Sequence, residues 1–110
     1  MKLLIAGSRS ITEFDLTGRV GADVELIICG GAKGIDLVAE RYADKKRISK
    51  LVLYPNYSLY GRAAPLKRNE IMVDIADEVL VIWDGKSKGA KYTAEYAKKT
   101  GKKDVIITCE

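Results

Sequence analysis

The sequence predicts an α/β fold in which a parallel sheet of five strands lies between layers of helices. Short apolar runs of strand length alternate along the chain with segments of helical periodicity, which is typical of repeated βαβ units. The first run, residues 3–6, is apolar without interruption, as expected for a strand buried on both faces. Three of the runs end in turns that combine glycine with polar or basic residues.

The first half of the chain contains two predicted strands and two predicted helices. The strands are residues 3–6 and 25–29, and a short helix is expected over residues 12–18. A longer helix is expected over residues 34–46, because apolar residues recur there at helical spacing. Its apolar face consists of Ile35, Val38, Ala39 and Tyr42.

The second half continues the alternation. Strands are expected over residues 50–54, 78–83 and 104–108, with a loop over residues 55–64. A helix over residues 65–75 begins with proline, which suits the first helical position. A last helix, residues 89–100, is closed by Gly101.

These elements predict a three-layer, Rossmann-like fold with strand order 3-2-1-4-5 and helices on both faces. Right-handed crossovers leave few other arrangements of parallel strands. We expect residues 1–110 to form one domain, since the chain shows no linker, repeat or low-complexity segment. Ligands of such sheets bind outside the carboxyl ends of the strands where the strand order reverses, here between the first and fourth strands.

The turns after the first, second and fourth strands meet at this switch point and suit phosphate binding. Glycine lets the backbone approach an anion, and the following helix directs free N–H groups and a positive dipole end toward it. Lysine, arginine and serine side chains add phosphate ligands. The candidate residues in the three turns are Gly7, Ser8, Arg9, Gly30, Gly31, Lys33, Gly34, Asp84, Gly85, Ser87, Lys88 and Gly89.

Further candidates lie beside these turns. Asp36, in the first turn of a predicted helix, suits either capping of free N–H groups or binding of a ribose hydroxyl. Tyrosines that recur every third residue from position 54 precede several cations, an arrangement that can stack a base and hold its phosphate. The residues selected here are Tyr60, Arg62, Arg68 and Asn69.

Composition excludes several kinds of chemistry. The chain has no histidine, which excludes Ser-His-Asp and Cys-His catalysis. Cys29 and Cys109 lie in apolar runs, so we expect buried, small apolar residues and no metal site. The net charge of +4 favours an anionic partner. No apolar run approaches the ~20 residues of a membrane span, and without an export signal we expect a cytoplasmic protein with no membrane partner.

Taken together, these motifs resemble the SLOG superfamily (SMF/DprA–LOG), and most closely its short YspA-like domains. The resemblance is carried by Gly7-Ser8-Arg9, the turn 30–36, Tyr60-Gly61-Arg62, Arg68-Asn69 and the turn 84–89. It implies a small sensor or regulatory domain that binds a nucleotide or nucleotide-derived ligand such as AMP, ADP-ribose or an NAD-like molecule. It also implies a homo-oligomer, and a bound nucleotide is the only cofactor it suggests.

Two branches of the superfamily provide alternatives. The DprA branch implies binding of single-stranded DNA, and Thr93 stands at the threonine position of its last motif. The phosphoribohydrolase branch implies hydrolysis of nucleotide N-glycosidic bonds, for which Asp36 or Glu70 of this chain would be the base. Within residues 87–93, however, threonine stands where that branch has its glutamate. We therefore expect a binding domain rather than an enzyme.

Overall fold

The structure, a computed structural model, describes residues 1–109 and contains one five-stranded parallel sheet in the order β3-β2-β1-β4-β5. This confirms the predicted fold class and strand order. In the central register, Leu4 of β1 lies opposite Ile28 of β2 and Val79 of β4. The strands are β1 (Lys2–Gly7), β2 (Leu26–Gly30), β3 (Ser49–Leu53), β4 (Glu78–Trp83) and β5 (Lys103–Thr108).

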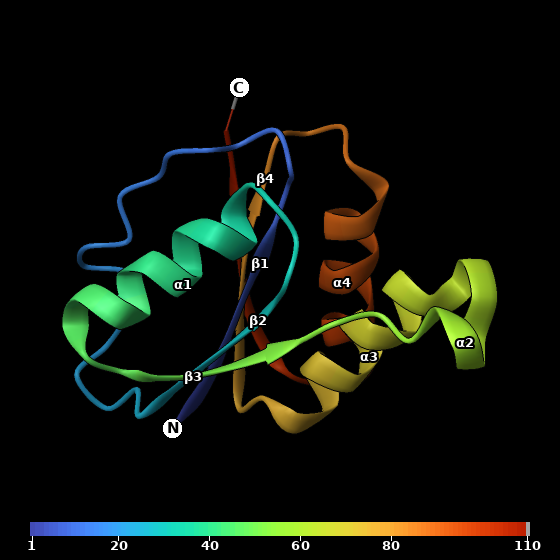
Figure 1. Cartoon of the computed structure of the whole chain (residues 1–110). Coiled ribbons are helices and arrows are strands. Elements are labelled where there is room, and N and C mark those ends of the chain that lie inside the picture. Colours follow the sequence, from blue (N-terminus) through green and yellow to red (C-terminus); the bar gives the residue numbers. More distant parts are fainter. Residues whose placement is uncertain (110) are drawn as a thin grey trace.

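Three helices cover the sheet, one on one face and two on the other (Figure 1). Helix α1 (Ile35–Lys46) packs on the first face, and its buried Ile35, Ala39 and Ala43 belong to one apolar cluster. Helices α3 (Ala64–Ile75) and α4 (Lys88–Lys99) pack on the other face. Alanines at helical spacing let α4 lie close to the sheet, since Ala90, Ala94 and Ala97 are all buried there.

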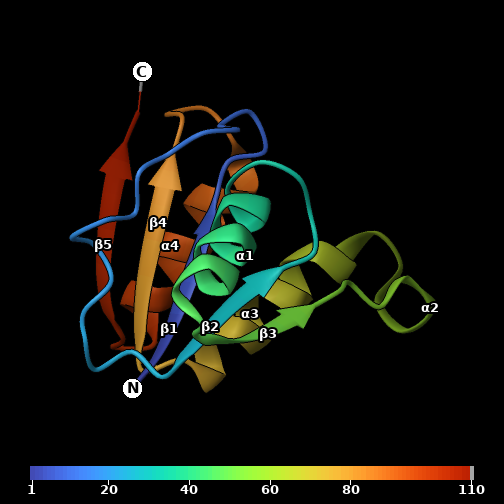
Figure 2. The same cartoon turned by 60° about the vertical axis from the view of Figure 1, so that its left-hand side comes forward.

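The helix predicted over residues 12–18 is absent, and an irregular segment connects β1 to β2. The side chain of Asp15 accepts a hydrogen bond from the backbone N–H of Thr17, and Gly18 follows with φ of 79°. Such a local bond competes with the helical pattern. The segment nevertheless buries Leu16 and Val24, and it passes over β4 and β5 on the face that α1 covers (Figure 2).

The predicted loop over residues 55–64 contains two short helical turns, α2 (Tyr57–Tyr60) and η1 (Gly61–Ala63). Asn56 starts α2, because its side-chain oxygen accepts a hydrogen bond from the N–H of Leu59. The predicted elements did not include this cap. Neither turn contains a buried residue, and α2 projects from the body of the molecule (Figure 1).

The two cysteines differ in environment. Cys29 is buried as predicted, and burial raises the pKa of its thiol to about 12. Cys109 is only partly buried, because it lies one residue beyond the edge strand β5; the prediction was wrong for this residue.

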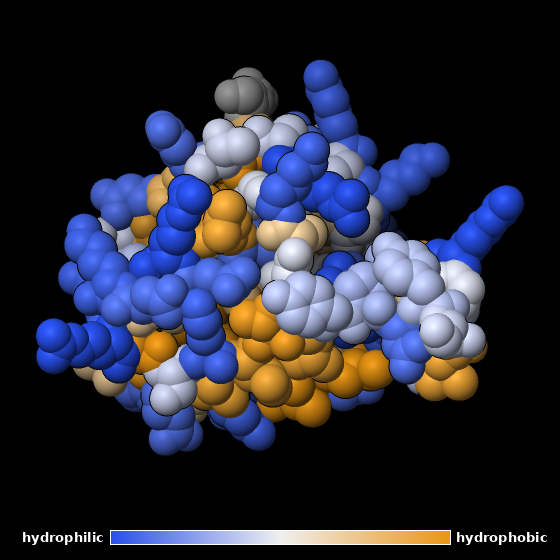
Figure 3. All heavy atoms as spheres, viewed as in Figure 1, coloured by the Kyte–Doolittle hydropathy of each residue, from blue (hydrophilic) through white to orange (hydrophobic). Residues whose placement is uncertain are grey.

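Charged side chains cover the α1 side of the face shown in Figure 3, and apolar surface gathers over β3 and α3. Leu51 and Ile71 are among the exposed apolar residues of these two elements. Within residues 1–109, every helix is too short or too polar to cross a lipid bilayer.

Candidate functional site

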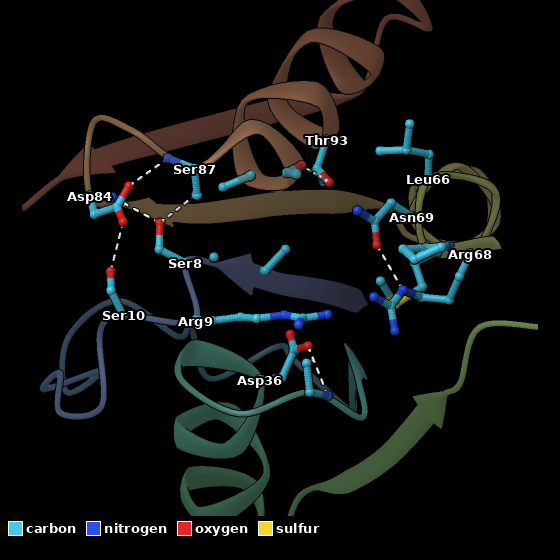
Figure 4. A pocket seen from close by; sticks show the side chains of 17 residues that line it. Ser8, Arg9, Ser10, Asp36, Leu66, Arg68, Asn69, Asp84, Ser87 and Thr93 are labelled. Carbon is cyan, nitrogen blue, oxygen red and sulfur yellow. Dashed lines mark hydrogen bonds between the residues drawn. The ribbon is translucent and has the colours of Figure 1, made fainter. Parts of the chain in front are cut away.

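A cavity of about 360 Å³ lies at the carboxyl ends of β1 and β4, at the switch point of the sheet (Figure 4). Its walls come from the turn after β1, the start of α1, one face of α3 and the start of α4. Each of the three predicted turns, together with the helix that follows it where there is one, contributes residues to this cavity. The predicted site residues that line the cavity are Gly7, Ser8, Arg9, Asp36, Arg68, Asn69, Asp84, Ser87 and Gly89.

The other predicted site residues do not line this cavity. Tyr60 and Arg62 lie on the projecting turns α2 and η1, and Lys33 is exposed on the turn after β2. The remaining residues of this group are glycines and a lysine of the three turns, namely Gly30, Gly31, Gly34, Gly85 and Lys88.

Sequence reasoning missed much of the α3 wall. Pro65 and Met72 line the cavity with Arg68 and Asn69, and their spacing places all four on one face of the helix. Helical periodicity could have identified them. The other residues left out of the predicted site are Ala6, Ser10, Ala32, Leu66, Ala90 and Thr93.

A hydrogen-bonded network closes one end of the cavity. Ser8 is 1% exposed, and its Oγ lies 2.8 Å from the Oγ of Ser87 and accepts the N–H of Asp84 at 2.9 Å. The carboxylate of Asp84 accepts hydrogen bonds from Ser10 Oγ at 2.7 Å and from the backbone N–H groups of Lys86 and Ser87 at 2.8 Å each. The Ser10 bond above all holds the pKa of Asp84 well below its usual range.

This network changes the role expected for the turn after β4. Asp84 already occupies two backbone N–H groups that an external phosphate would otherwise use. Its carboxylate therefore acts as an internal anion that shapes the turn. The backbone N–H groups of the first turn of α4 lie beyond this network.

The first turn of α4 is open toward the cavity. Its N-cap residue, Ser87, makes no capping hydrogen bond with its side chain, and the first turn contains no acidic residue. A Cβ built on Gly89 would meet no atom within 4 Å, so the fold itself does not require glycine here. The helix thus presents free N–H groups and its positive dipole end to the cavity.

Asp36 of α1 and Arg68 of α3 are two buried ionisable residues that line the cavity, each 8% exposed. Asp36 Oδ2 accepts the N–H of Ala32 at 3.2 Å. Burial raises the pKa of Asp36 to about 6, although the Ala32 hydrogen bond and the cations Arg68 and Arg9 oppose the shift. Burial also lowers the pKa of Arg68.

The guanidinium of Arg9 extends across the cavity beside Asp36 (Figure 4). The side chain is exposed, and it makes no ion pair or hydrogen bond with any side chain among residues 1–109. It is therefore a cation free to bind an anionic ligand.

Glu70, the other carboxylate considered as a catalytic base, does not line the cavity. It accepts a hydrogen bond from the hydroxyl of Tyr92 and lies 3.7 Å from Lys67 Nζ. The bond from Tyr92 ties α3 to α4, so Glu70 links two walls of the cavity.

Comparisons of the chain with models of protein families, with curated proteins and with solved structures found no match in any of the three.

Proposed function

We propose that the cavity binds a nucleotide or nucleotide-derived molecule, such as AMP, ADP-ribose or an NAD-like ligand, and that the chain is a small sensor or regulatory domain. The observation that carries the proposal is that the open first turn of α4 and the free guanidinium of Arg9 line the same cavity. A helix N-terminus and an unpaired arginine are a suitable pair of ligands for a phosphate. The resemblance of the turns to those of SLOG domains supports the same class of ligand.

Each wall of the cavity suits one part of such a ligand. Gly89 and Arg9 suit the phosphate, and Asp36 and Asn69 suit the hydroxyls of the ribose. Leu66, which is 38% exposed, offers an apolar surface for the base. The volume of about 360 Å³ lies near the lower end of the range for small-molecule pockets, which favours a compact ligand.

The first experiment is calorimetric titration of the purified chain with AMP, ADP-ribose and NAD, followed by the same titrations of Gly89→Ala. The added methyl group meets no protein atom but narrows the cavity at the start of α4. We expect affinity for the best ligand to fall tenfold or more, while the melting temperature stays the same or rises, because alanine favours helix over glycine by about 1 kcal/mol.

A matched pair of charge deletions identifies the phosphate ligand. Arg9→Ala removes a cation that lines the cavity, and Lys33→Ala removes an exposed cation that does not. We expect only Arg9→Ala to weaken binding. Equal effects of the two variants, or unchanged affinity in both Arg9→Ala and Gly89→Ala, would contradict this assignment of the site.

One observation favours a second candidate function, hydrolysis of a nucleotide N-glycosidic bond. Asp36 lines the cavity, and its pKa of about 6 is suited to proton transfer near neutral pH. Incubation with AMP, followed by chromatography for free adenine, tests this alternative. Release that disappears in Asp36→Asn supports hydrolysis, and no release above the blank excludes it for AMP.

A further inference from the structure

The guanidinium of Arg68 is directed toward the protein's own groups. Its Nε donates a hydrogen bond to Asn69 Oδ1 at 2.7 Å, and its Nη1 donates to the carbonyl oxygen of Leu53, at the end of β3, at 3.1 Å. The side chain is 8% exposed. These contacts fix Arg68 in place and make it a poor candidate for the phosphate ligand that the sequence suggested.

The same contact determines the orientation of the Asn69 side chain. Arginine has only donors, so the oxygen of the Asn69 carboxamide must face Arg68 Nε. The NH₂ group is then the end directed at the cavity, as Figure 4 shows. Asn69 therefore offers a hydrogen-bond donor to a ligand.

Asp36 offers the complementary acceptor from another wall of the same cavity. One of its oxygens is held by the N–H of Ala32, which orients the carboxyl group. Arg68, which binds Asn69, also lies near Asp36. Its Nη1 and Asp36 Oδ2 would lie 2.6 and 2.8 Å from a Cβ built on Gly30. One buried guanidinium thus stands next to both polar groups.

We propose that Arg68 is a positioning residue that fixes Asn69 as a donor in the cavity that also holds the Asp36 acceptor, and that this pair selects ligands with both vicinal hydroxyls of a ribose over their deoxy counterparts. A hydroxyl both donates and accepts, so two neighbouring hydroxyls satisfy both groups at once. A ligand that lacks one of them leaves either the half-buried amide of Asn69 or the buried carboxyl group of Asp36 without that contact, which weakens binding. The proposal rests on the proposed nucleotide-binding function.

The decisive experiment compares AMP with 2′-deoxy-AMP and 3′-deoxy-AMP by calorimetric titration at pH 7.5. We expect at least one deoxy compound to bind tenfold or more weakly than AMP. If all three bind with affinities within twofold of one another, the selection of ribose is wrong, although nucleotide binding stands. If none of them, nor ADP-ribose or NAD, binds, the proposed function and this inference both fail.

Two variants test the orientation of Asn69. Asn69→Asp is nearly isosteric and keeps an acceptor for Arg68 Nε, but it replaces the donor in the cavity with an acceptor. We expect its melting temperature to stay close to that of the unmodified chain, its affinity for AMP to fall tenfold or more, and the preference over the deoxy compound to drop below threefold. Full retention of the preference would overturn the proposal.

Arg68→Lys keeps the positive charge but cannot reproduce the bond from Nε. We expect the preference for ribose to fall while affinity for inorganic phosphate, which contacts neither Asn69 nor Asp36 in this scheme, stays the same. If the role of Arg68 were merely structural, the variant would bind both AMP and inorganic phosphate more weakly. If Arg68→Lys does not fold, the Asn69→Asp titrations decide the question alone.

Discussion

Gly30 contributes space to the candidate site. A Cβ at this position would lie 2.6 Å from Arg68 Nη1 and 2.8 Å from Asp36 Oδ2, closer than atoms can pack. The residue was predicted as a phosphate ligand because glycine exposes backbone. The structure indicates a different use, since the missing side chain lets a buried cation and a buried carboxyl group come together.

The titration of Asp36 leads to a prediction about pH. Its folded-state pKa of about 6 lies above the ordinary value of 3.8, so its contribution to stability is greatest below pH 4 and is lost as the pH rises through 6. The carboxamide introduced by Asp36→Asn does not titrate. We expect the free energy of unfolding of Asp36→Asn, relative to that of the unmodified chain, to rise by up to about 3 kcal/mol between pH 3.5 and 7.5.

Urea denaturation across this pH range measures the effect, and Asp77→Asn is the control. Asp77 accepts a hydrogen bond from the N–H of Lys2, which lowers the pKa of its carboxyl group. Its contribution therefore has the opposite sign: it is present above the ordinary pKa and is lost on acidification. Asp36→Asn and wild-type curves that run parallel from pH 3.5 to 7.5 would show that Asp36 titrates normally.

At the scale of elements, the turn between β2 and α1 docks directly on the turn after β1. Gly34 has φ of 79° and ψ of −132°, a conformation that residues with a side chain rarely adopt. A Cβ here would lie 2.5 Å from Arg9 Cα and 2.5 Å from the carbonyl oxygen of Ser8. This contact sets the distance between the start of α1, which carries Asp36, and the Ser8–Arg9 turn.

We expect Gly34→Ala to lower the free energy of unfolding by about 3 kcal/mol or more, because backbone strain and a clash with backbone atoms add together. Gly101→Ala is the matched control. Gly101 also has a positive φ, 77°, but a Cβ there meets no atom within 4 Å. Its cost is therefore expected to be near 1 kcal/mol. Equal losses for the two variants in urea denaturation would contradict the docking argument.

At the scale of the whole molecule, an irregular segment covers part of one face of the sheet, where a helix would otherwise pack. Leu16 is 2% exposed although it lies outside any helix or strand, and it packs in the same cluster as Leu80 and Ile82 of β4. Helix α1 and the segment between β1 and β2 together cover one face of the sheet. Stability of that face thus depends on side chains of a segment without regular structure.

The corresponding prediction is a contrast between two leucines. We expect Leu16→Ala to lower the free energy of unfolding by about 2–5 kcal/mol, as for a leucine in a packed core. Leu37→Ala, at a position of α1 that is 38% exposed, should change it by less than about 1 kcal/mol. Chemical denaturation of both variants measures the contrast. A small effect at Leu16 would mean that the segment does not pack on β4.

The parts of the fold that could be predicted are those that depend on local sequence patterns. Apolar runs and helical periodicity depend on neighbouring residues, so the five strands and the helices over α1, α3 and α4 follow from the chain itself. Two features were not predicted: the absence of a helix over residues 12–18, and the short turns α2 and η1. They depend on single side-chain hydrogen bonds of Asp15 and Asn56, which carry little weight against periodicity.

The sequence by itself determined the order of the strands and the switch point where the turns meet, because parallel strands joined by right-handed crossovers allow few arrangements. Only the tertiary structure decided what each turn residue does. The carboxylate of Asp84 accepts hydrogen bonds from N–H groups of its own turn and from Ser10, which lies 74 residues away in the sequence. The guanidinium of Arg68 binds the carbonyl oxygen of Leu53. Such roles depend on partners that folding brings together, and no local spacing encodes them.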